Sequence, residues 1–234
     1  MEAALYLIPC TLGDTPLERV LPAYNTEIIR GIRHFIVEEI RTARRFLRRV
    51  DREFPIDDSV FYEMGKRADE QCFASYLQPI AEGHPVGVIS EAGCPAVADP
   101  GADIVCIAQR RGIRVIPLVG PNSMIMAVMA SGLNGQSFAF NGYLPIDDGE
   151  RAQRLKVLEQ RAQCERQTQL FIETPYRNHK MFDALLRILN PRTSLCLAAG
   201  ITTQDEWIHT HTIAEWKHIK LPDLSKVPAI FLIL

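Results

Sequence analysis

Two short loops rich in glycine and proline carry the residues best suited to binding a small molecule. One is SEAGCPAVADPG at residues 90–101 and the other is GPNS at residues 120–123, and each directly follows an apolar run. Parallel α/β sheets bind ligands beyond the carboxyl ends of their strands, where both loops would lie. Glycines allow close backbone approach to a ligand, and prolines lower the cost of ordering a loop. A plain strand-to-helix connection is the alternative for each loop, but two such loops on one sheet favour a shared pocket.

A cluster of arginines is the second feature with chemical consequences. It comprises Arg41, Arg44, Arg45, Arg48, Arg49 and Arg52. Helical spacing places positions 41, 45, 48 and 52 on one face, which would suit the phosphates of RNA. The same charges would also fit a solvated helix face balanced by Glu38, Glu39, Asp51 and Glu53. At the level of sequence both interpretations stay open.

A pair of histidines is the third feature. His209 and His211 alternate on a predicted strand, so both side chains point to the same side. A metal site needs further ligands, and none lies nearby in the sequence. We therefore expect a polar sheet face and no metal.

These residues must be positioned by a regular α/β framework. Apolar runs predict strands at residues 3–8, 34–37, 85–89, 114–119 and 138–140, and amphipathic stretches predict helices at residues 41–50, 68–82, 103–111 and 122–130. This alternation predicts a largely parallel sheet covered by helices on its faces. The polar segment YLPIDDGE at residues 143–150 indicates a domain boundary.

The same alternation resumes after that segment. Helices are predicted at residues 151–163 and 178–189, and strands at residues 168–172, 194–198, 206–212 and 229–234. We therefore expect two α/β domains, residues 1–143 and 144–234.

Composition limits the class of protein. The chain has 234 residues, 47% of them hydrophobic, and a net charge of -2, so its overall charge gives no support for nucleic-acid binding. Its six cysteines form no C-x-x-C pair, which predicts reduced and mostly buried thiols. The N-terminus does not read as a signal peptide, and apolar runs stay well short of the roughly 20 residues that span a bilayer. We expect a cytoplasmic protein that does not enter a membrane.

The loop at residues 90–101 resembles the SDAGTPLISDPG-type loop of the tetrapyrrole methylase superfamily. Its most similar branch is the ribosomal RNA small subunit methyltransferase I group, whose other motifs are matched in the same order along nearly the whole chain. These matches are EEIR at residues 38–41 with Arg44 (for E-D-T-R…R), VGPNS at 119–123 (G-P-S), ASGL at 130–133 (S-G-L), NGYLP at 141–145 (G-F-L-P), FIETPYR at 171–177 (F-x-E-S-P-x-R) and VPAI at 227–230 (the last strand of the superfamily).

The resemblance implies a fold, a cofactor and a partner. From the resemblance we expect two α/β domains of the tetrapyrrole methylase type with S-adenosylmethionine in the cleft between them, and a homodimer acting on ribosomal RNA or the small ribosomal subunit. The cofactor residues implied by position are Ser90, Glu91, Ala92, Gly93, Pro95, Pro121, Asn122, Ser123, Thr174, Pro175, Ala199 and Ala229. The implied substrate residues are Glu38, Arg41, Arg44 and Arg177.

Methyl transfer to a hydroxyl oxygen requires a proton acceptor, which typically accelerates such a step by about 10²–10⁴-fold. Three carboxylates near the expected cleft are candidates, Glu173, Glu91 and Asp99, and Glu38 lies further off. For Glu173 the alternative is an ion pair with Arg177, four residues later.

The chain also departs from the family pattern. Glu91 replaces an Asp and Cys94 replaces a Thr. The charged R-E-L-T-K segment of the family is AGITT at residues 199–203, and the basic residues after G-F-L-P are IDD at residues 146–148. We also expect no counterpart of the C-terminal extension of longer relatives. Because lost basic charge weakens phosphate contacts, two alternatives stay open: a methyltransferase of small, tetrapyrrole-like molecules, and a non-catalytic S-adenosylmethionine-binding protein.

Overall fold

A computed structural model describes residues 1–64 and 72–234 of the chain. The chain divides into two compact units, Met1–Asn122 and Ser123–Leu234. Each unit contains its own five-stranded sheet. This division places the boundary earlier than the polar segment at residues 143–150 had suggested.

The first unit is built on a parallel sheet with the strand order β3-β2-β4-β1-β5. The strands are β1 (Leu5–Ile8), β2 (His34–Val37), β3 (Val60–Glu63), β4 (Val86–Ile89) and β5 (Val115–Pro117). The helical segments are α1 (Leu17–Val20), α2 (Ala23–Arg30), α3 (Ile40–Val50), the 3-10 turn η2 (Ser75–Leu77), α4 (Gln78–Ala81) and α5 (Gly101–Arg110).

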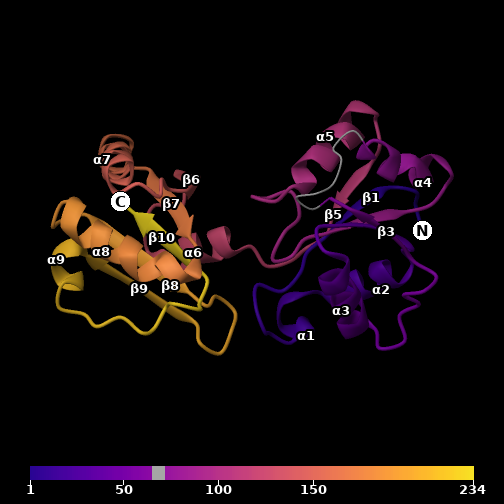
Figure 1. The fold of residues 1–234 in the computed structure, drawn as a ribbon, viewed down its shortest axis with the longest axis horizontal. Helices are drawn as coiled ribbons and strands as arrows, with labels where there is room; N and C mark the ends of the chain where they lie inside the picture. Colours follow the sequence, from indigo (N-terminus) through magenta and orange to yellow (C-terminus); the bar gives the residue numbers. More distant parts are fainter. Residues whose placement is uncertain (65–71) are drawn as a thin grey trace. The chain divides into compact units, whose positions relative to one another are not determined.

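Alternation along β1 sorts these helices onto two faces of the sheet. Tyr6 and Ile8 pack in one core with the buried sides of α2 and α3, whereas Leu5 packs in a second core with α5 and η2. Because successive side chains of a strand point to opposite faces, α2 and α3 cover one face and α5 covers the other (Figure 1). All four residues of β4 are buried, as expected of a central strand in a parallel sheet.

The second unit has a mixed sheet with the order β6-β7-β10-β8-β9, in which β6 and β7 are parallel and the other neighbours are antiparallel. Its strands are β6 (Phe138–Tyr143), β7 (Thr168–Glu173), β8 (Ser194–Ala199), β9 (Trp207–Thr212) and β10 (Ala229–Ile233). Its helical segments are α6 (Ser123–Ser131), α7 (Asp148–Glu165), the 3-10 turn η3 (Pro175–Arg177), α8 (Asn178–Ile188) and α9 (Ile213–Trp216).

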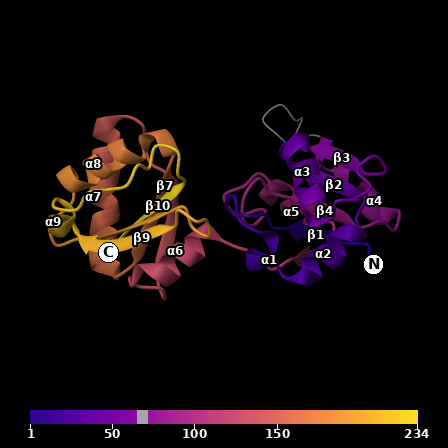
Figure 2. The same ribbon diagram turned by 90° about the horizontal axis from the view of Figure 1, so that it is seen from below.

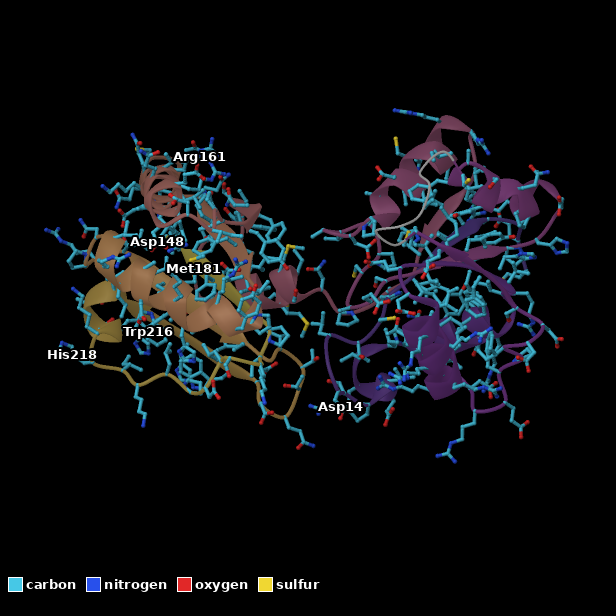
Figure 3. The ribbon with its side chains drawn as sticks, in the orientation of Figure 1. Asp14, Asp148, Arg161, Met181, Trp216 and His218 are labelled. Atoms are coloured by element: carbon cyan, nitrogen blue, oxygen red, sulfur yellow. The ribbon has the colours of Figure 1, made fainter. Side chains whose placement is uncertain are left out.

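The core of the second unit lies between its sheet and the helices α7, α8 and α9. Met181 and Trp216, labelled in Figure 3, are buried there against Phe171 and Phe231 of the sheet. Helix α6 packs on the other face of the sheet (Figure 2). There the Thr210 hydroxyl donates to the Ser131 carbonyl at 2.7 Å.

The structure corrects several expectations. Strand β6 belongs to the second unit because it pairs with β7, and α6 belongs there because it packs on β8, β9 and β10. The single helix expected at residues 68–82 lies partly outside the described residues, and its described part is η2 followed by the short helix α4. Helices α1 and α2 and strand β3 were not expected.

The thiols also differ from the expectation. Cys72, Cys106 and Cys164 are exposed, so the cysteines are not mostly buried. Within the described ranges, no helix combines the length and apolar character needed to cross a membrane.

Candidate active site

The chain connections diverge at the carboxyl ends of β1 and β4 in the first unit. The two strands are neighbours in the sheet, yet the chain leaves β1 toward the face of α2 and α3 and leaves β4 toward the face of α5. In parallel α/β sheets, ligands bind where neighbouring connections diverge in this way. The loop at residues 90–101 starts at this point.

Internal hydrogen bonds hold that loop in one conformation. The Ser90 hydroxyl donates to the Gly93 carbonyl at 2.8 Å, and the Cys10 backbone N–H donates to the same oxygen at 2.9 Å. At the other end, Asp99 Oδ1 accepts the backbone N–H groups of Ala96 and Gly101 at 3.1 and 2.6 Å. Ser90 is buried, and its hydroxyl group both shapes the loop and retains an oxygen that can accept a hydrogen bond.

Backbone strain accompanies this conformation. Gly93, Ala96 and Ala98 all have positive φ angles, 71°, 64° and 56°. The left-handed region costs little for glycine but about 1–2 kcal/mol for an alanine. Strained residues persist only where their surroundings over-determine them, and they concentrate at functional sites.

The loop after β5 is locked against this one. A Cβ atom on Gly120 would lie 2.3 Å from the Pro9 ring, so only glycine allows the approach to the end of β1. The Asn25 amide donates to the Val119 carbonyl at 2.8 Å, and the Cys94 thiol donates to the Pro121 carbonyl with a sulfur–oxygen distance of 3.4 Å. The two loops expected to share a pocket are therefore in direct contact.

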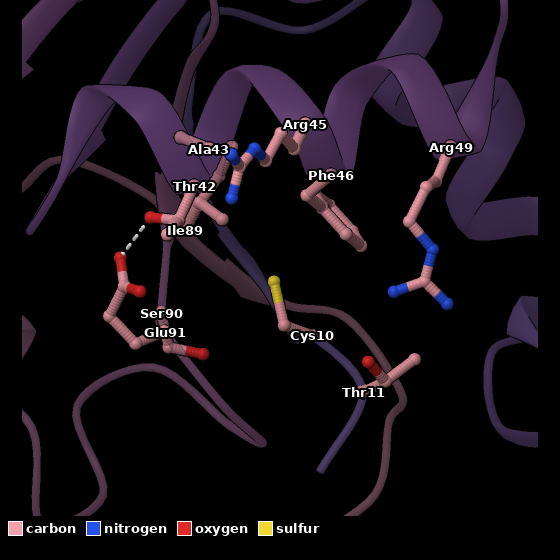
Figure 4. A pocket seen from close by; sticks show the side chains of 10 residues that line it. All are labelled: Cys10, Thr11, Thr42, Ala43, Arg45, Phe46, Arg49, Ile89, Ser90 and Glu91. Carbon is pink, nitrogen blue, oxygen red and sulfur yellow. Dashed lines mark hydrogen bonds between the residues drawn. The ribbon is translucent and has the colours of Figure 1, made fainter. Parts of the chain in front are cut away.

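A pocket of about 240 Å³ opens beside these loops. It is lined by Cys10, Thr11, Thr42, Ala43, Arg45, Phe46, Arg49, Ile89, Ser90 and Glu91. Figure 4 shows Arg49 extending from α3 toward Thr11, and the Thr42 hydroxyl facing the Glu91 carboxylate at 2.6 Å. Hydroxyls, a carboxylate and two guanidinium groups thus meet over an apolar floor.

Three carboxyl groups lie close together at this edge of the sheet. Glu38 directly follows β2, and Glu91 and Asp99 belong to the loop that follows β4. Burial, the nearby negative charge of Asp99 and a hydrogen bond with its carboxyl group together raise the pKa of Glu38 to about 7, with a smaller contribution from Glu91. Asp99 Oδ1 accepts two backbone N–H groups, which hold its side chain in place beside Glu38. The site therefore holds a carboxyl group that exchanges its proton near neutral pH.

In the second unit, the predicted residues gather at one edge of the sheet. Ala229 pairs with both Glu173 and Ala199, and Thr174 and Pro175 directly follow Glu173. Their contribution to cofactor binding stays a prediction.

Glu173 itself forms an ion pair. Its Oε1 accepts from the Arg177 guanidinium, 2.8 Å away, and from the Thr174 backbone N–H at 2.7 Å. The Glu173 carboxylate is almost fully buried. The ion pair that the i, i+4 spacing suggested is present, which leaves Glu173 poorly available as a proton acceptor.

The other predicted residues surround the edge of the first sheet. Ala92 is exposed, Pro95 and Pro121 are buried, and Asn122 and Ser123 are half-buried at the boundary between the units. Arg41 and Arg44 are exposed on α3, the helix that also supplies Thr42 to the pocket.

Sequence reasoning missed Cys10, Thr11 and Thr42. Cys10 and Thr11 follow β1, so their position after a predicted strand was the available signal. Thr42 sits among arginines and carried no signal of its own.

The histidine pair lies on β9 as expected. The rings of His209 and His211 stack on one another, and Trp207 and Trp216 flank them. Among the described residues, no group of three or more His, Cys, Asp or Glu side chains is placed to hold a metal ion.

Similar proteins show the family of this chain. The chain is 35% identical to the ribosomal RNA small subunit methyltransferase I of Mesorhizobium japonicum over 213 residues, covering 91% of this chain and 68% of that protein. It is 27% identical to the protein of the same name from Escherichia coli O157:H7, covering 92% of this chain and 71% of that protein. The chain belongs to the ribosomal RNA small subunit methyltransferase I family. It is an S-adenosylmethionine-dependent methyltransferase.

Solved structures support the fold of this family. The methyltransferase CobJ matches with a TM-score of 0.62 at 15% identity, covering 98% of this chain and 93% of that one. Uroporphyrin III C-methyltransferase from Thermus thermophilus matches with a TM-score of 0.53 at 19% identity, covering 98% of this chain and 96% of that one. At such identities the likeness shows the two-domain α/β fold alone. No family model matches the chain.

The pocket residues fit the cofactor of the ribosomal RNA small subunit methyltransferase I family. S-adenosylmethionine carries a carboxylate, an ammonium group, ribose hydroxyls and a sulfonium. Arg45 and Arg49 offer partners for a carboxylate, and Glu91 offers one for an ammonium or for ribose hydroxyls. The volume of about 240 Å³ is slightly below the range of about 300–1,000 Å³ usual for ligand sites, so this pocket would hold part of the molecule.

Proposed function

We propose that this protein methylates a ribose hydroxyl of small-subunit ribosomal RNA. The observation that carries the proposal is the position of Glu91, which lines the pocket together with Arg45 and Arg49 and also lies near Glu38, whose pKa is raised to about 7 by burial and by Asp99. A hydroxyl nucleophile needs a proton acceptor such as Glu38, and the exposed Arg41 and Arg44 of α3 suit a phosphate-bearing substrate. Membership of the ribosomal RNA small subunit methyltransferase I family points to the same substrate.

The cofactor supplies an activated methyl group. In this proposal Glu91, Arg45 and Arg49 bind its polar groups, while Gly93 and Pro121 shape the backbone around it. Thr174, Pro175, Ala199 and Ala229 are further candidates in the second unit. Fixing the two reactants in line is the main contribution of the protein, worth roughly 7–11 kcal/mol of the barrier.

The proton of the substrate hydroxyl is assigned to the Glu38–Asp99 pair. The bound cofactor would supply the methyl group to the substrate oxygen, and the Glu38 carboxylate would accept the proton that this oxygen loses. A pKa near 7 suits this task because a base works best when its pKa lies close to the working pH.

Asp99, Glu91 and Glu173 have other roles in this proposal. Asp99 fixes its loop and shares the proton of Glu38, Glu91 faces Thr42 and the pocket, and Glu173 is committed to Arg177. Arg177 therefore maintains an edge of the second sheet instead of binding substrate directly.

We also propose that the protein is a cytoplasmic homodimer, as the family resemblance implies. Light scattering of the purified protein tests the dimer, and a single-chain mass would refute it. Cell fractionation tests the location.

Methyl transfer with tritiated S-adenosylmethionine tests the function directly. Small ribosomal subunits, free small-subunit RNA and a tetrapyrrole precursor are compared as acceptors. We expect label in ribosomal RNA at a position resistant to alkaline cleavage, because a 2′-O-methyl group blocks that hydrolysis. Label in the tetrapyrrole alone would establish the small-molecule alternative, and binding without transfer would establish the non-catalytic one.

A further inference from the structure

Helix α3 presents a hollow lined by arginines on the first unit. The hollow has a volume of about 470 Å³ and is lined by Arg44, Arg45, Arg48, Arg49, Ile56 and Asp57. All four arginines are exposed, and Asp57 is the one acidic residue of this lining. Several positive charges therefore face one small volume.

Neighbouring carboxylates offset these charges only in part: Asp57 lines the hollow, and the charge of Arg48 contributes to the lowered pKa of Asp51 without forming an ion pair with it. Asp51 pairs with Arg30 at 2.8 Å, Glu39 accepts the Arg41 backbone N–H, and Glu38 shares its proton with Asp99. Across residues 1–64 and 72–234, no carboxylate forms an ion pair with any of the four arginines. The sequence left two interpretations open, a face that binds RNA phosphates and a solvated helix face balanced by carboxylates. The lack of ion pairs with these four arginines among the described residues favours the first.

Neutral groups hold three of the four guanidinium groups in place. Arg44 lies over the Phe61 ring at 5.3 Å, Arg48 donates to the Arg52 carbonyl at 2.6 Å, and Arg49 donates to the Thr15 carbonyl at 2.7 Å. These contacts order the cations without cancelling their charge. An anion binding there would meet pre-organised partners, which lowers the entropy cost of binding.

The hollow adjoins the methyl-transfer pocket. Arg45 and Arg49 line both cavities, and Figure 4 shows these two side chains from the pocket side. An anionic chain lying in the hollow would therefore have its neighbouring groups close to the pocket.

We infer that this hollow binds consecutive phosphates of a single RNA strand and so delivers a ribose to the pocket. The inference rests on the proposed function. Every cation of the cluster is an arginine, whose planar guanidinium binds phosphate oxygens in pairs and stacks on unpaired bases. A membrane surface fits less well, because the apolar residues of α3 face the core, whereas membrane-surface helices present an apolar face.

RNA binding by an Arg44→Gln/Arg48→Gln variant tests the inference. These two arginines line the hollow but not the pocket, so cofactor binding measured by calorimetry should stay unchanged. The control is Arg110→Gln/Arg187→Gln, which removes the same charge from two exposed arginines on α5 and α8.

The probe is a fluorescent single-stranded RNA of small-subunit sequence, titrated at several salt concentrations. We expect the double variant to bind roughly tenfold more weakly, and its salt slope to fall by about 1.4, or about 0.7 for each lost phosphate contact. In methyl transfer, its KM for RNA should rise while kcat stays near the wild-type value. The single Arg48→Gln variant should show about half the change in slope.

Three results would overturn the inference. One is an unchanged RNA affinity and salt slope in the double variant, and another is an equal loss in the control. The third is binding of wild type to phosphatidylserine vesicles but not to RNA. If wild type methylates RNA while either of the first two results holds, only the inference fails; if wild type neither binds nor methylates RNA, the proposed function fails with it.

Discussion

Replacing Glu38 with Gln should stabilise the protein at alkaline pH while abolishing most of its turnover. Gln is close in shape to the protonated carboxyl group and can still donate to Asp99. It removes the need to place a charge beside Asp99 and Glu91 in a partly buried position, which is what raises the pKa of Glu38. Stability and activity should therefore move in opposite directions.

The magnitude follows from the pKa. Burial and the neighbouring carboxylates raise the pKa of Glu38 from 4.5 to about 7, and each pH unit of that difference corresponds to about 1.4 kcal/mol. The upper limit is about 3.4 kcal/mol, which solvent screening of a half-buried group reduces to about 1–2 kcal/mol. Because the pKa in the folded state exceeds that in the unfolded state, the wild type loses this free energy as the pH rises from about 4.5 to about 7.

Urea unfolding at pH 5 and pH 8 measures the effect. Glu38→Gln should exceed the wild type by about 1–2 kcal/mol at pH 8, and the gap should shrink strongly at pH 5. The control is Glu39→Gln at the adjacent exposed position, whose carboxylate caps α3 through the Arg41 N–H. That variant should lose up to about 1 kcal/mol, with no gain at high pH. A Glu38→Gln variant that is less stable at pH 8, or a gap independent of pH, would refute the reasoning.

Three further substitutions test the architecture of the site. Gly120→Ala should cost about 1–3 kcal/mol and weaken cofactor binding, because its Cβ would meet Pro9, whereas Gly135→Ala has ordinary contacts and should leave calorimetric titrations unchanged. Arg177→Met should cost about 3 kcal/mol or more in urea unfolding because Glu173 would be left buried without its cation, and a loss below 1 kcal/mol would contradict the ion pair. Cys94→Thr should preserve cofactor affinity, because a hydroxyl can replace the thiol as donor to the Pro121 carbonyl. Cys94→Ala should weaken cofactor affinity several-fold. Equal cofactor affinities of the two variants would show that this link between the loops is unimportant.

Many of the strands and helices could be predicted from the sequence because short stretches of chain determine them. The apolar runs predicted β1, β4 and β10 within a few residues, and the arginine-rich period predicted α3. The i, i+4 spacing predicted the Glu173–Arg177 pair. These features depend on periodicity and burial along one short stretch of chain.

Features that depend on pairing between strands far apart in the sequence could not be predicted. Strand β3 has no buried residue, so it carries no core signal. The domain boundary depends on β6 choosing β7 as its partner, which the turn-rich segment after it does not reveal. The meeting of Glu38 and Asp99 follows from β2 lying next to β4, and strand order is not written in either strand.

The central claim is that the chain methylates ribose in small-subunit ribosomal RNA with the pocket at the end of β1 and β4. Mapping 2′-O-methylation of that RNA in cells lacking the protein tests it most directly. We predict that one ribose methyl mark disappears, that the wild-type gene restores it, and that Glu38→Gln protein, produced at the same level, does not. A methylation map unchanged by loss of the protein would contradict the ribosomal substrate, and full restoration by Glu38→Gln would remove Glu38 from the reaction.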